Sequence, residues 1–239
     1  MKLCILTGGS RGLGAELQSV LEARGWTVHE ISRSGSSPTS FRFDLANTGR
    51  LDEVQAWMSG LVQGVPPERA VFVHNAGQVE PIARMGSVPR REAIEALQAG
   101  VVAPYVLIAG FVELLRDAPI PKAVVNISSG AASKGYAGWS LYCAQKAALE
   151  NALRALFEEE KSEARPYRVV SVNPHVMDTA MQARIRAADP AHFPQKDRFV
   201  KLKAEGQLLS PVDVARAVAD VVEDDSAMEF LVSVKERLG

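Results

Sequence analysis

The sequence predicts an α/β fold in which one doubly wound parallel β-sheet forms a single domain over residues 1–239. Two observations predict this fold. Short β-branched runs alternate along the chain with longer segments that carry apolar residues at three- and four-residue spacing. Most of the short runs are apolar on both faces, which is typical of strands that helices cover on both sides of a sheet.

The strands are expected, in chain order, at residues 3–6, 27–31, 41–43, 70–73, 123–127, 169–172 and 230–234. The helices are expected at residues 13–23, 51–61, 94–115, 144–157 and 212–222. Two segments, 32–40 and 177–209, fit neither pattern. The second contains Pro190 and Pro194, and we expect a substrate loop that folds over the site as a lid, although a surface excursion without function is an alternative.

Size, composition and charge fit a soluble globular protein. The 239 residues are 47% hydrophobic and 23% charged, and their formal net charge of −1 argues against a broad basic surface for nucleic acid. Two cysteines, Cys4 and Cys143, cannot form a disulfide framework, so we expect a cytoplasmic protein. The apolar start is too short for a signal peptide, and Pro104 and Gly110 interrupt the longest apolar stretch, so no membrane span is expected.

A glycine-rich turn follows the first strand and precedes the first helix. Gly8, Gly12 and Gly14 let the backbone turn sharply and let a pyrophosphate approach the helix N-terminus, as in a Rossmann dinucleotide site. A purely structural turn is the alternative. The residues expected to contact the cofactor here are Gly8, Ser10, Arg11, Gly12, Leu13 and Gly14.

Charge at the end of the second strand favours NADP over NAD. Arg33 follows this strand and Arg11 lies in the glycine turn, so both cations can meet a ribose 2′-phosphate, helped by the hydroxyl of Ser32. Glu30 is the alternative, an acidic residue that would bind the 2′-hydroxyl of NAD.

The next two strand ends carry polar or small residues. Asp44 and Leu45 are placed to meet the adenine, and Asn75, Ala76 and Gly77 the adenosine ribose.

Tyr142 and Lys146 lie four residues apart, so they share one face of a helix. A phenol needs a neighbouring cation to act as an acid near neutral pH, and Lys146 supplies one. Ser129 follows the fifth strand, where its hydroxyl can bind a substrate oxygen. The reaction implied is hydride transfer from a nicotinamide to a carbonyl carbon, with Tyr142 as the proton donor.

These motifs together resemble the short-chain dehydrogenase/reductase family over the whole chain. They are Thr7-Gly8-x-x-x-Gly12-x-Gly14, Asn75-Ala76-Gly77, Ser129, Tyr142-x-x-x-Lys146, and Pro174 with Thr179. The resemblance implies that Ser129 positions the carbonyl, Tyr142 donates the proton, and Lys146 binds the nicotinamide ribose and lowers the pKa of Tyr142. It also implies that Thr179 contacts the carboxamide region and that Pro174 and Val176 contact the cofactor.

Further segments look like the bacterial benzil reductases and the related sepiapterin reductases, which reduce vicinal dicarbonyls. Among them are 127–131, 138–143, 178–182 and 208–211. This likeness implies an apolar pocket above the nicotinamide, lined by Trp139, Val176, Met177, Met181 and Phe199. A packing role is the equal alternative for Trp139.

The chain departs from the family pattern at two positions. Gly100 stands where the family has an Asn that completes a catalytic tetrad through a water near the lysine. His175 follows Pro174 where the family has Gly, so a positive φ there would strain it.

The intact Ser129, Tyr142 and Lys146 favour an NADPH-dependent carbonyl reductase with a small carbonyl substrate. The alternatives are an NADP-binding regulatory protein with weakened catalysis, suggested by Gly100 and His175, and an enzyme for 3-oxoacyl thioesters or alcohols. A homodimer is expected. The histidines have no metal-ligand spacing, so no metal is expected.

Overall fold

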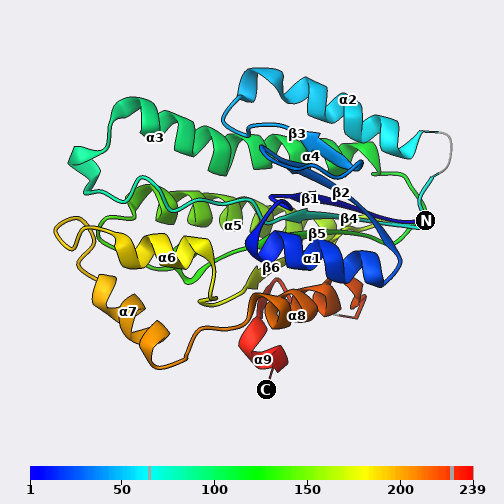
Figure 1. Ribbon diagram of the computed structural model, residues 1–239. Coiled ribbons are helices and arrows are strands. Elements are labelled where there is room, and N and C mark those ends of the chain that lie inside the picture. The colour runs from blue at the N-terminus through cyan, green and yellow to red at the C-terminus, as the bar shows by residue number, and fades with distance from the viewer. Residues whose placement is uncertain (64–65, 227–228, 239) are drawn as a thin grey trace.

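The computed structural model describes residues 1–63, 66–226 and 229–238. Over this part of the chain, seven strands form one parallel sheet in the order β3-β2-β1-β4-β5-β6-β7 (Figure 1). The strands are β1 (Lys2–Thr7), β2 (Trp26–Ser32), β3 (Ser40–Arg42), β4 (Arg69–His74), β5 (Lys122–Ile127), β6 (Arg168–Asn173) and β7 (Leu231–Ser233). The predicted doubly wound α/β fold is confirmed.

Helices cover both faces of the sheet, as Figure 1 shows. They are α1 (Gly12–Ala23), α2 (Leu51–Val62), α3 (Arg90–Leu97), α4 (Ala103–Leu114), α5 (Ser140–Glu160), α6 (Ala180–Ala187), α7 (Lys196–Ala204), α8 (Pro211–Glu223) and α9 (Val234–Leu238). The last of these was not expected from the sequence.

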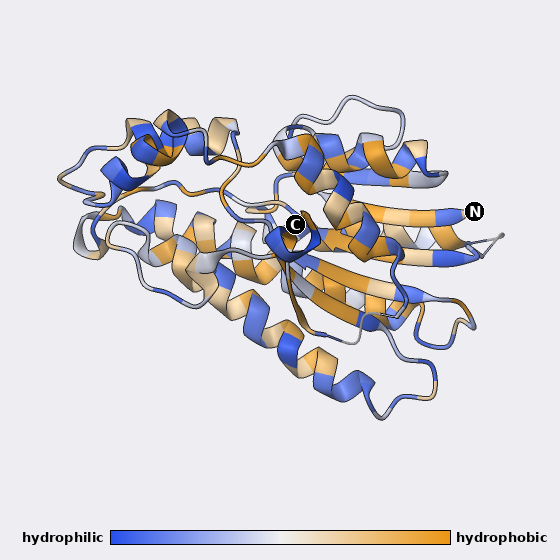
Figure 2. Ribbon diagram, turned by 90° about the horizontal axis from the view of Figure 1, so that it is seen from below, coloured by the Kyte–Doolittle hydropathy of each residue, from blue (hydrophilic) through white to orange (hydrophobic). Residues whose placement is uncertain are grey.

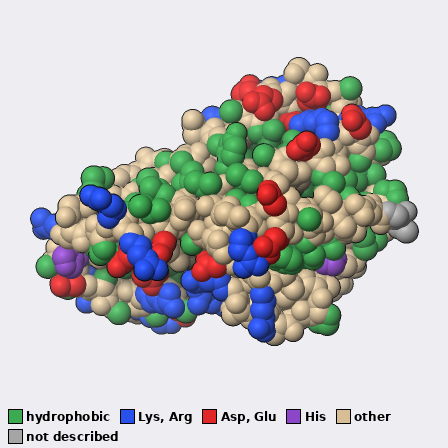
Figure 3. All heavy atoms as spheres, turned by 90° about the horizontal axis from the view of Figure 1, so that it is seen from above, with side chains coloured by type: hydrophobic (Ala, Val, Ile, Leu, Met, Phe, Trp, Pro, Cys, Tyr) green, Lys and Arg blue, Asp and Glu red, His purple; other side chains and the backbone are tan. Residues whose placement is uncertain are grey.

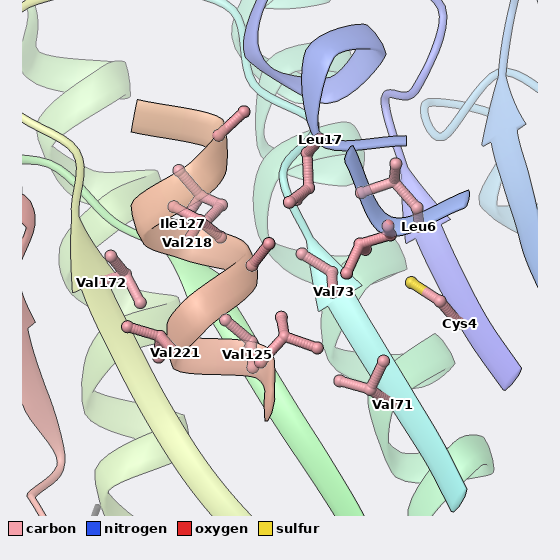
Figure 4. Packing of buried hydrophobic residues seen from close by; sticks show 14 of the residues in the cluster. Cys4, Leu6, Leu17, Val71, Val73, Val125, Ile127, Val172, Val218 and Val221 are labelled. Carbon is pink, nitrogen blue, oxygen red and sulfur yellow. The ribbon is translucent and has the colours of Figure 1, made fainter. Parts of the chain in front are cut away.

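Strand alternation divides the core between the two faces. Cys4 and Leu6 of β1 point towards α1 and α8, whereas Leu3 and Ile5 point towards α2, α4 and α5. Figure 4 shows the part of the core on the α1 and α8 side of the sheet, where Val218 of α8 packs over the strands. Because both faces are covered, the central strands are mostly hydrophobic between their ends, whereas the covering helices alternate (Figure 2).

The predicted helix at residues 94–115 differs in detail. It starts earlier, at Arg90, and a π-helical turn at Gln98–Val102 lies between α3 and α4. A proline in a regular helix would clash with the carbonyl four residues earlier, which for Pro104 is that of Gly100. The π-helical turn widens the backbone at this point, so the helical path continues through the proline.

The expectation that Pro104 and Gly110 interrupt this stretch is therefore wrong. Arg90–Leu114 forms a helical segment of 25 residues that is long and apolar enough, by length and composition, to cross a membrane, and 33% of its most apolar part is buried. Core helices of soluble proteins meet the same criterion, so the segment is weak support for a membrane span.

Residues 177–209 also differ from the prediction, because they are not a loop. They form α6 and α7, and Pro190 and Pro194 lie between these helices. The segment closes on itself at its base: the amide of Asp178 donates to the carbonyl of Leu209 at 3.0 Å. We call residues 177–209 the cap; it lies beside the carboxyl ends of the strands (Figure 1).

Candidate active site

A cavity of about 530 Å³ lies at the carboxyl ends of the strands. It opens where the strand order reverses, between β1 and β4, which is the position of ligand sites in doubly wound sheets. The predicted site residues that line it are Gly8, Ser10, Arg11, Gly12, Leu13, Ser32, Arg33, Asp44, Leu45, Asn75, Ala76, Gly77, Ser129, Trp139, Tyr142, Lys146, Pro174, Val176, Met177, Thr179, Met181 and Phe199.

Gly14 is the exception, because it does not line the cavity. A Cβ there would lie 2.0 Å from the carbonyl oxygen of Gly8 and 2.5 Å from Nδ2 of Asn75. Gly14 is therefore needed for the packing of the turn on α1. Gly8 and Gly12 have φ values of +73° and +55°, which suit glycine.

Thr7 and Asn75 tie the glycine turn to the end of β4. Nδ2 of Asn75 donates to the carbonyl of Gly8 at 2.9 Å, and Oγ1 of Thr7 accepts from the amides of Asn75 and Ala76. The same hydroxyl lies 2.9 Å from Nδ1 of His74. Since it already accepts two bonds, it donates its proton to Nδ1.

Burial lowers the pKa of His74 to about 3, with a smaller contribution from Lys146, so this imidazole is neutral. His74 is thus part of the scaffold that holds the turn.

The acidic and basic groups near the end of β2 face different spaces. Arg11 and Arg33 are exposed at the large cavity. Glu30 is 1% exposed and faces a separate cavity of about 190 Å³, lined mostly by serines. Ser32 lies between the two, donating to Oε1 of Glu30 and accepting from the amide of Gly35. Glu30 is therefore directed away from the cavity that would hold a ribose.

Ser129, Tyr142 and Lys146 all line the cavity. Helix α5 begins at Ser140, earlier than predicted, so both Tyr142 and Lys146 lie in its first two turns. They are 9% and 8% exposed. The ammonium of Lys146 donates to the carbonyl of Ile127 at 2.7 Å.

Burial is the main cause of the pKa shifts in this group. It lowers the pKa of Lys146 to about 8, opposed by the charge of Glu150. Burial also raises the pKa of Tyr142, opposed by a hydrogen bond with the hydroxyl of Ser129. The ammonium of Lys146 is hydrogen-bonded to a backbone carbonyl and not to the phenol of Tyr142. That Lys146 lowers the pKa of Tyr142 therefore stays a prediction.

Glu150 was not expected from the sequence. Its Oε2 accepts from the hydroxyls of Ser128 and, at 3.2 Å, Ser171. These bonds hold a carboxylate one helical turn beyond Lys146. An acidic residue at this spacing is common on helices, so nothing in the sequence alone marked it.

An aromatic cluster joins the cap to the N-terminal end of α5. Trp139 stacks on Phe193 with ring centroids 4.6 Å apart and packs against Phe199 at 5.4 Å. A Cβ at Gly138 would lie 2.3 Å from the carbonyl of His192, so the two backbones approach closely here. Trp139 both lines the cavity and packs in this cluster, and its contact with a substrate stays a prediction.

The two departures from the family pattern have structural consequences. His175 has a φ of +59°, an unfavourable value for a residue with a Cβ, and its Nε2 lies 2.8 Å from Oγ of Ser233. Burial lowers the pKa of His175 below its usual value. At Gly100 the side chain of Gln145 takes the space, since a Cβ there would lie 2.4 Å from Cδ of Gln145.

Further lining residues were not predicted from the sequence. Those contributed by the segment after β5, by α5 and by the cap include Lys134, Tyr136, Gln145, Arg184 and Arg198. Only the fold brings them to the cavity. Over the described ranges, no group of three or more His, Cys, Asp or Glu side chains is arranged to hold a metal ion.

Comparison with known proteins places this geometry in a family. Residues 2–190 match the sequence profile of the short chain dehydrogenases. A benzil reductase ((S)-benzoin forming) of Bacillus subtilis is 34% identical over 246 residues, covering 100% of both chains. A sepiapterin reductase of Xenopus tropicalis is 30% identical, covering 94% of this chain and 92% of the relative.

The fold also matches solved structures. One is a short chain dehydrogenase of Shigella flexneri complexed with NADP, with a TM-score of 0.77 and 23% identity. The match covers 98% of this chain and 97% of that one.

Proposed function

This chain belongs to the short-chain dehydrogenase family and is an oxidoreductase, and on that premise we propose that it is an NADPH-dependent reductase of ketones or vicinal diketones. The observation that carries the proposal is the convergence of Ser129, Tyr142 and Lys146 on one cavity at the switch point of the sheet. The names of the relatives, benzil reductase and sepiapterin reductase, support carbonyl substrates.

The residues around the glycine turn fit a dinucleotide phosphate. A Cβ at Gly8 would lie 2.8 Å from Cα of Ala76, so the turn is packed tightly beside the N-terminus of α1, where a pyrophosphate is favoured. Arg11 and Arg33 would hold the 2′-phosphate of NADP, and Glu30 faces elsewhere. Bound NADPH supplies the hydride.

The chain's own groups then handle the proton and the substrate. The phenol of Tyr142 donates a proton to the carbonyl oxygen, and the hydroxyl of Ser129 binds that oxygen. Lys146 stabilises the phenolate that remains. Trp139, Met181 and Phe199 provide an apolar wall for the organic part of the substrate.

Replacing the phenol tests the proposal. Purified protein is incubated with NADPH and benzil, and cofactor absorbance is followed. Tyr142→Phe should reduce kcat by at least about 100-fold while NADPH still binds. Unchanged turnover in this variant would contradict the proposal. Tight NADPH binding without turnover on diketones, pterins or 3-oxoacyl thioesters would instead select a regulatory binding protein.

Coenzyme preference is tested at the arginines. Arg33→Ala should weaken NADPH binding about tenfold or more, because a charge-assisted hydrogen bond is lost, and should leave NADH binding nearly unchanged. Arg91→Ala is the matched control, since Arg91 is exposed on α3 and forms its ion pair with the neighbouring Glu95. An equal loss for NADH and NADPH would exclude the proposed role of Arg33.

A cytoplasmic homodimer, expected from the sequence, completes the proposal. Ile94, Leu97, Val102 and Tyr105 are exposed hydrophobic side chains of the 90–114 segment. The face that carries α2 and α3 mixes hydrophobic groups with both signs of charge (Figure 3). Gel filtration should give twice the chain mass, and Tyr105→Lys should lower it; a wild-type mass of one chain would exclude the dimer.

A further inference from the structure

Gln145 lies on α5 between Tyr142 and Lys146 and is 4% exposed. Its carboxamide packs against Gly100, where a Cβ would lie 2.4 Å from both Cδ and Oε1. Any larger residue at position 100 would displace it. The buried Nε2 has no hydrogen-bond partner among the described residues.

Leaving a buried amide nitrogen without a hydrogen-bond partner is unfavourable, so such groups in folded proteins usually have a partner or a role. Gln145 and Gly100 line the same cavity as Tyr142 and Lys146. An acceptor for Nε2 can therefore come from within the cavity, and a water molecule is the smallest one.

The two neighbours of Gln145 need such a water. Tyr142 loses a proton at each turnover, and both it and Lys146 are less than 10% exposed. Among the described residues, the ammonium of Lys146 donates one hydrogen bond, to the carbonyl of Ile127, so two of its three N–H groups can make other bonds. Both side chains line the cavity, so water molecules within it provide a route for a proton from solvent to this pair.

We propose that Gln145 is a positioning residue whose amide holds the water that returns protons to Lys146 and Tyr142, and that residue 100 is glycine to make room for it. The proposal rests on the proposed reductase function. In each turnover the carbonyl carbon takes a hydride from NADPH and its oxygen takes the proton of Tyr142. One proton from solvent then restores the phenol, and no electrons pass through Gln145.

Charged groups near Lys146 do not replace Gln145 in this role. His74, facing from β4, stays neutral because burial lowers its pKa to about 3. Glu150, on α5, is held by the hydroxyls of Ser128 and Ser171. Because Gln145 is uncharged, replacing it changes the path of the proton without removing a charge.

The test uses Gln145→Met, which fills the same space without an amide. We expect NADPH binding within about twofold of wild type and kcat lowered about tenfold. We also expect kcat to rise with imidazole buffer concentration at constant pH, because a soluble acid then supplies the proton. Wild type should show no buffer dependence.

Two further variants and one control sharpen this test. Gly100→Ala should displace the amide and give the same buffer dependence, and combining it with Gln145→Met should add nothing. Gln55→Ala is the control, because Gln55 packs against Gly110 in the same way, away from the cavity. It should show no buffer dependence.

A crystal structure provides a readout that does not depend on activity. It should show an ordered water within hydrogen-bond distance of Nε2 of Gln145 in wild type and none at that point in Gln145→Met. Wild-type kcat in Gln145→Met and Gly100→Ala would overturn the inference. If Tyr142→Phe lost turnover in that case, the proposed reductase function would stand although the role of Gln145 had been overturned.

Discussion

The sheet end of the cavity and the cap are built by different kinds of contact. At the sheet end, Gly8, Gly14 and Asn75 are held by backbone approaches and by bonds to main-chain carbonyls. In the cap, Phe193 and Phe199 pack on Trp139. The first region has almost no freedom in residue choice, whereas aromatic packing tolerates other shapes.

This difference assigns separate tasks to the two regions. The sheet end must present the same surface to a dinucleotide whatever the substrate, so backbone contacts suit it. The cap must fit one organic group, and side chains can change that fit without disturbing the sheet. Variants at the sheet end should therefore change the affinity for NADPH, and variants in the cap should change KM for the carbonyl substrate.

The largest effect is expected in the glycine turn. Gly14→Ala places a Cβ 2.0 Å from the carbonyl oxygen of Gly8, so the turn must move. We expect a loss of about 3 kcal/mol or more in the free energy of unfolding, and NADPH affinity lowered on the order of 100-fold. Urea unfolding measures the change in stability, and fluorescence titration measures the affinity for NADPH.

Gly60→Ala is the control for this variant. Gly60 lies in α2, and a Cβ there would have no described residue within 4 Å apart from its own helix and chain neighbours. Alanine should leave NADPH binding unchanged and stabilise the helix by up to about 1 kcal/mol. Normal NADPH affinity in Gly14→Ala would remove the distinction between the two regions.

The same difference explains what could be predicted from the sequence. Backbone requirements leave residues that are recognisable by type and spacing, so the glycine turn and Asn75 were found. The helices of the cap were missed because prolines and charges surround short amphipathic segments such as 180–187. The pairing of Gly100 with Gln145 joins elements 45 residues apart, and no local pattern indicates it.

In the cap, the largest effect is expected at Phe193, which is fully buried. Phe193→Ala should cost about 3–5 kcal/mol of stability if the whole chain unfolds as one unit. It should raise KM for benzil about tenfold and leave the affinity for NADPH within about twofold. Thermal unfolding and steady-state kinetics provide the data, with Val200→Ala, an exposed position of α7, as the control. A parallel loss of NADPH affinity would mean that the cap and the turn are one unit.

At the sheet end, His74 predicts how stability depends on pH. Its pKa is about 3 in the folded chain and near 6.5 when unfolded, so below pH 6.5 the unfolded state binds more protons. This costs about 2–3 kcal/mol at pH 4.5 relative to pH 7. His74→Asn should remove that part of the pH dependence. Equal slopes of unfolding free energy against pH in both proteins would contradict the assignment.

A smaller effect is expected at Glu150, whose charge opposes the burial that lowers the pKa of Lys146 to about 8. Activity requires the protonated ammonium, so it should fall as pH rises through that pKa. Glu150→Gln removes the opposing charge, and the basic limb of kcat/KM should therefore move to lower pH. Ser171→Ala, which removes only one of the bonds to Glu150, should move the limb less. A shift to higher pH would show that the carboxylate acts otherwise.

The smallest effect is expected for the ion pair between Arg184 of the cap and Glu80, at 2.9 Å. Their side chains are 51% and 41% exposed, so water and salt screen the attraction. Arg184→Ala should change stability by less than about 1 kcal/mol, and added salt should reduce the difference further. Because aromatic packing already holds the cap, KM for benzil should stay within about twofold. A tenfold rise in KM in Arg184→Ala, matched by a similar rise in wild type at 0.5 M salt (on the order of a 4 Å screening length), would mean that exposed charges close the cap. The cap would then differ from the sheet end through electrostatics instead of aromatic packing.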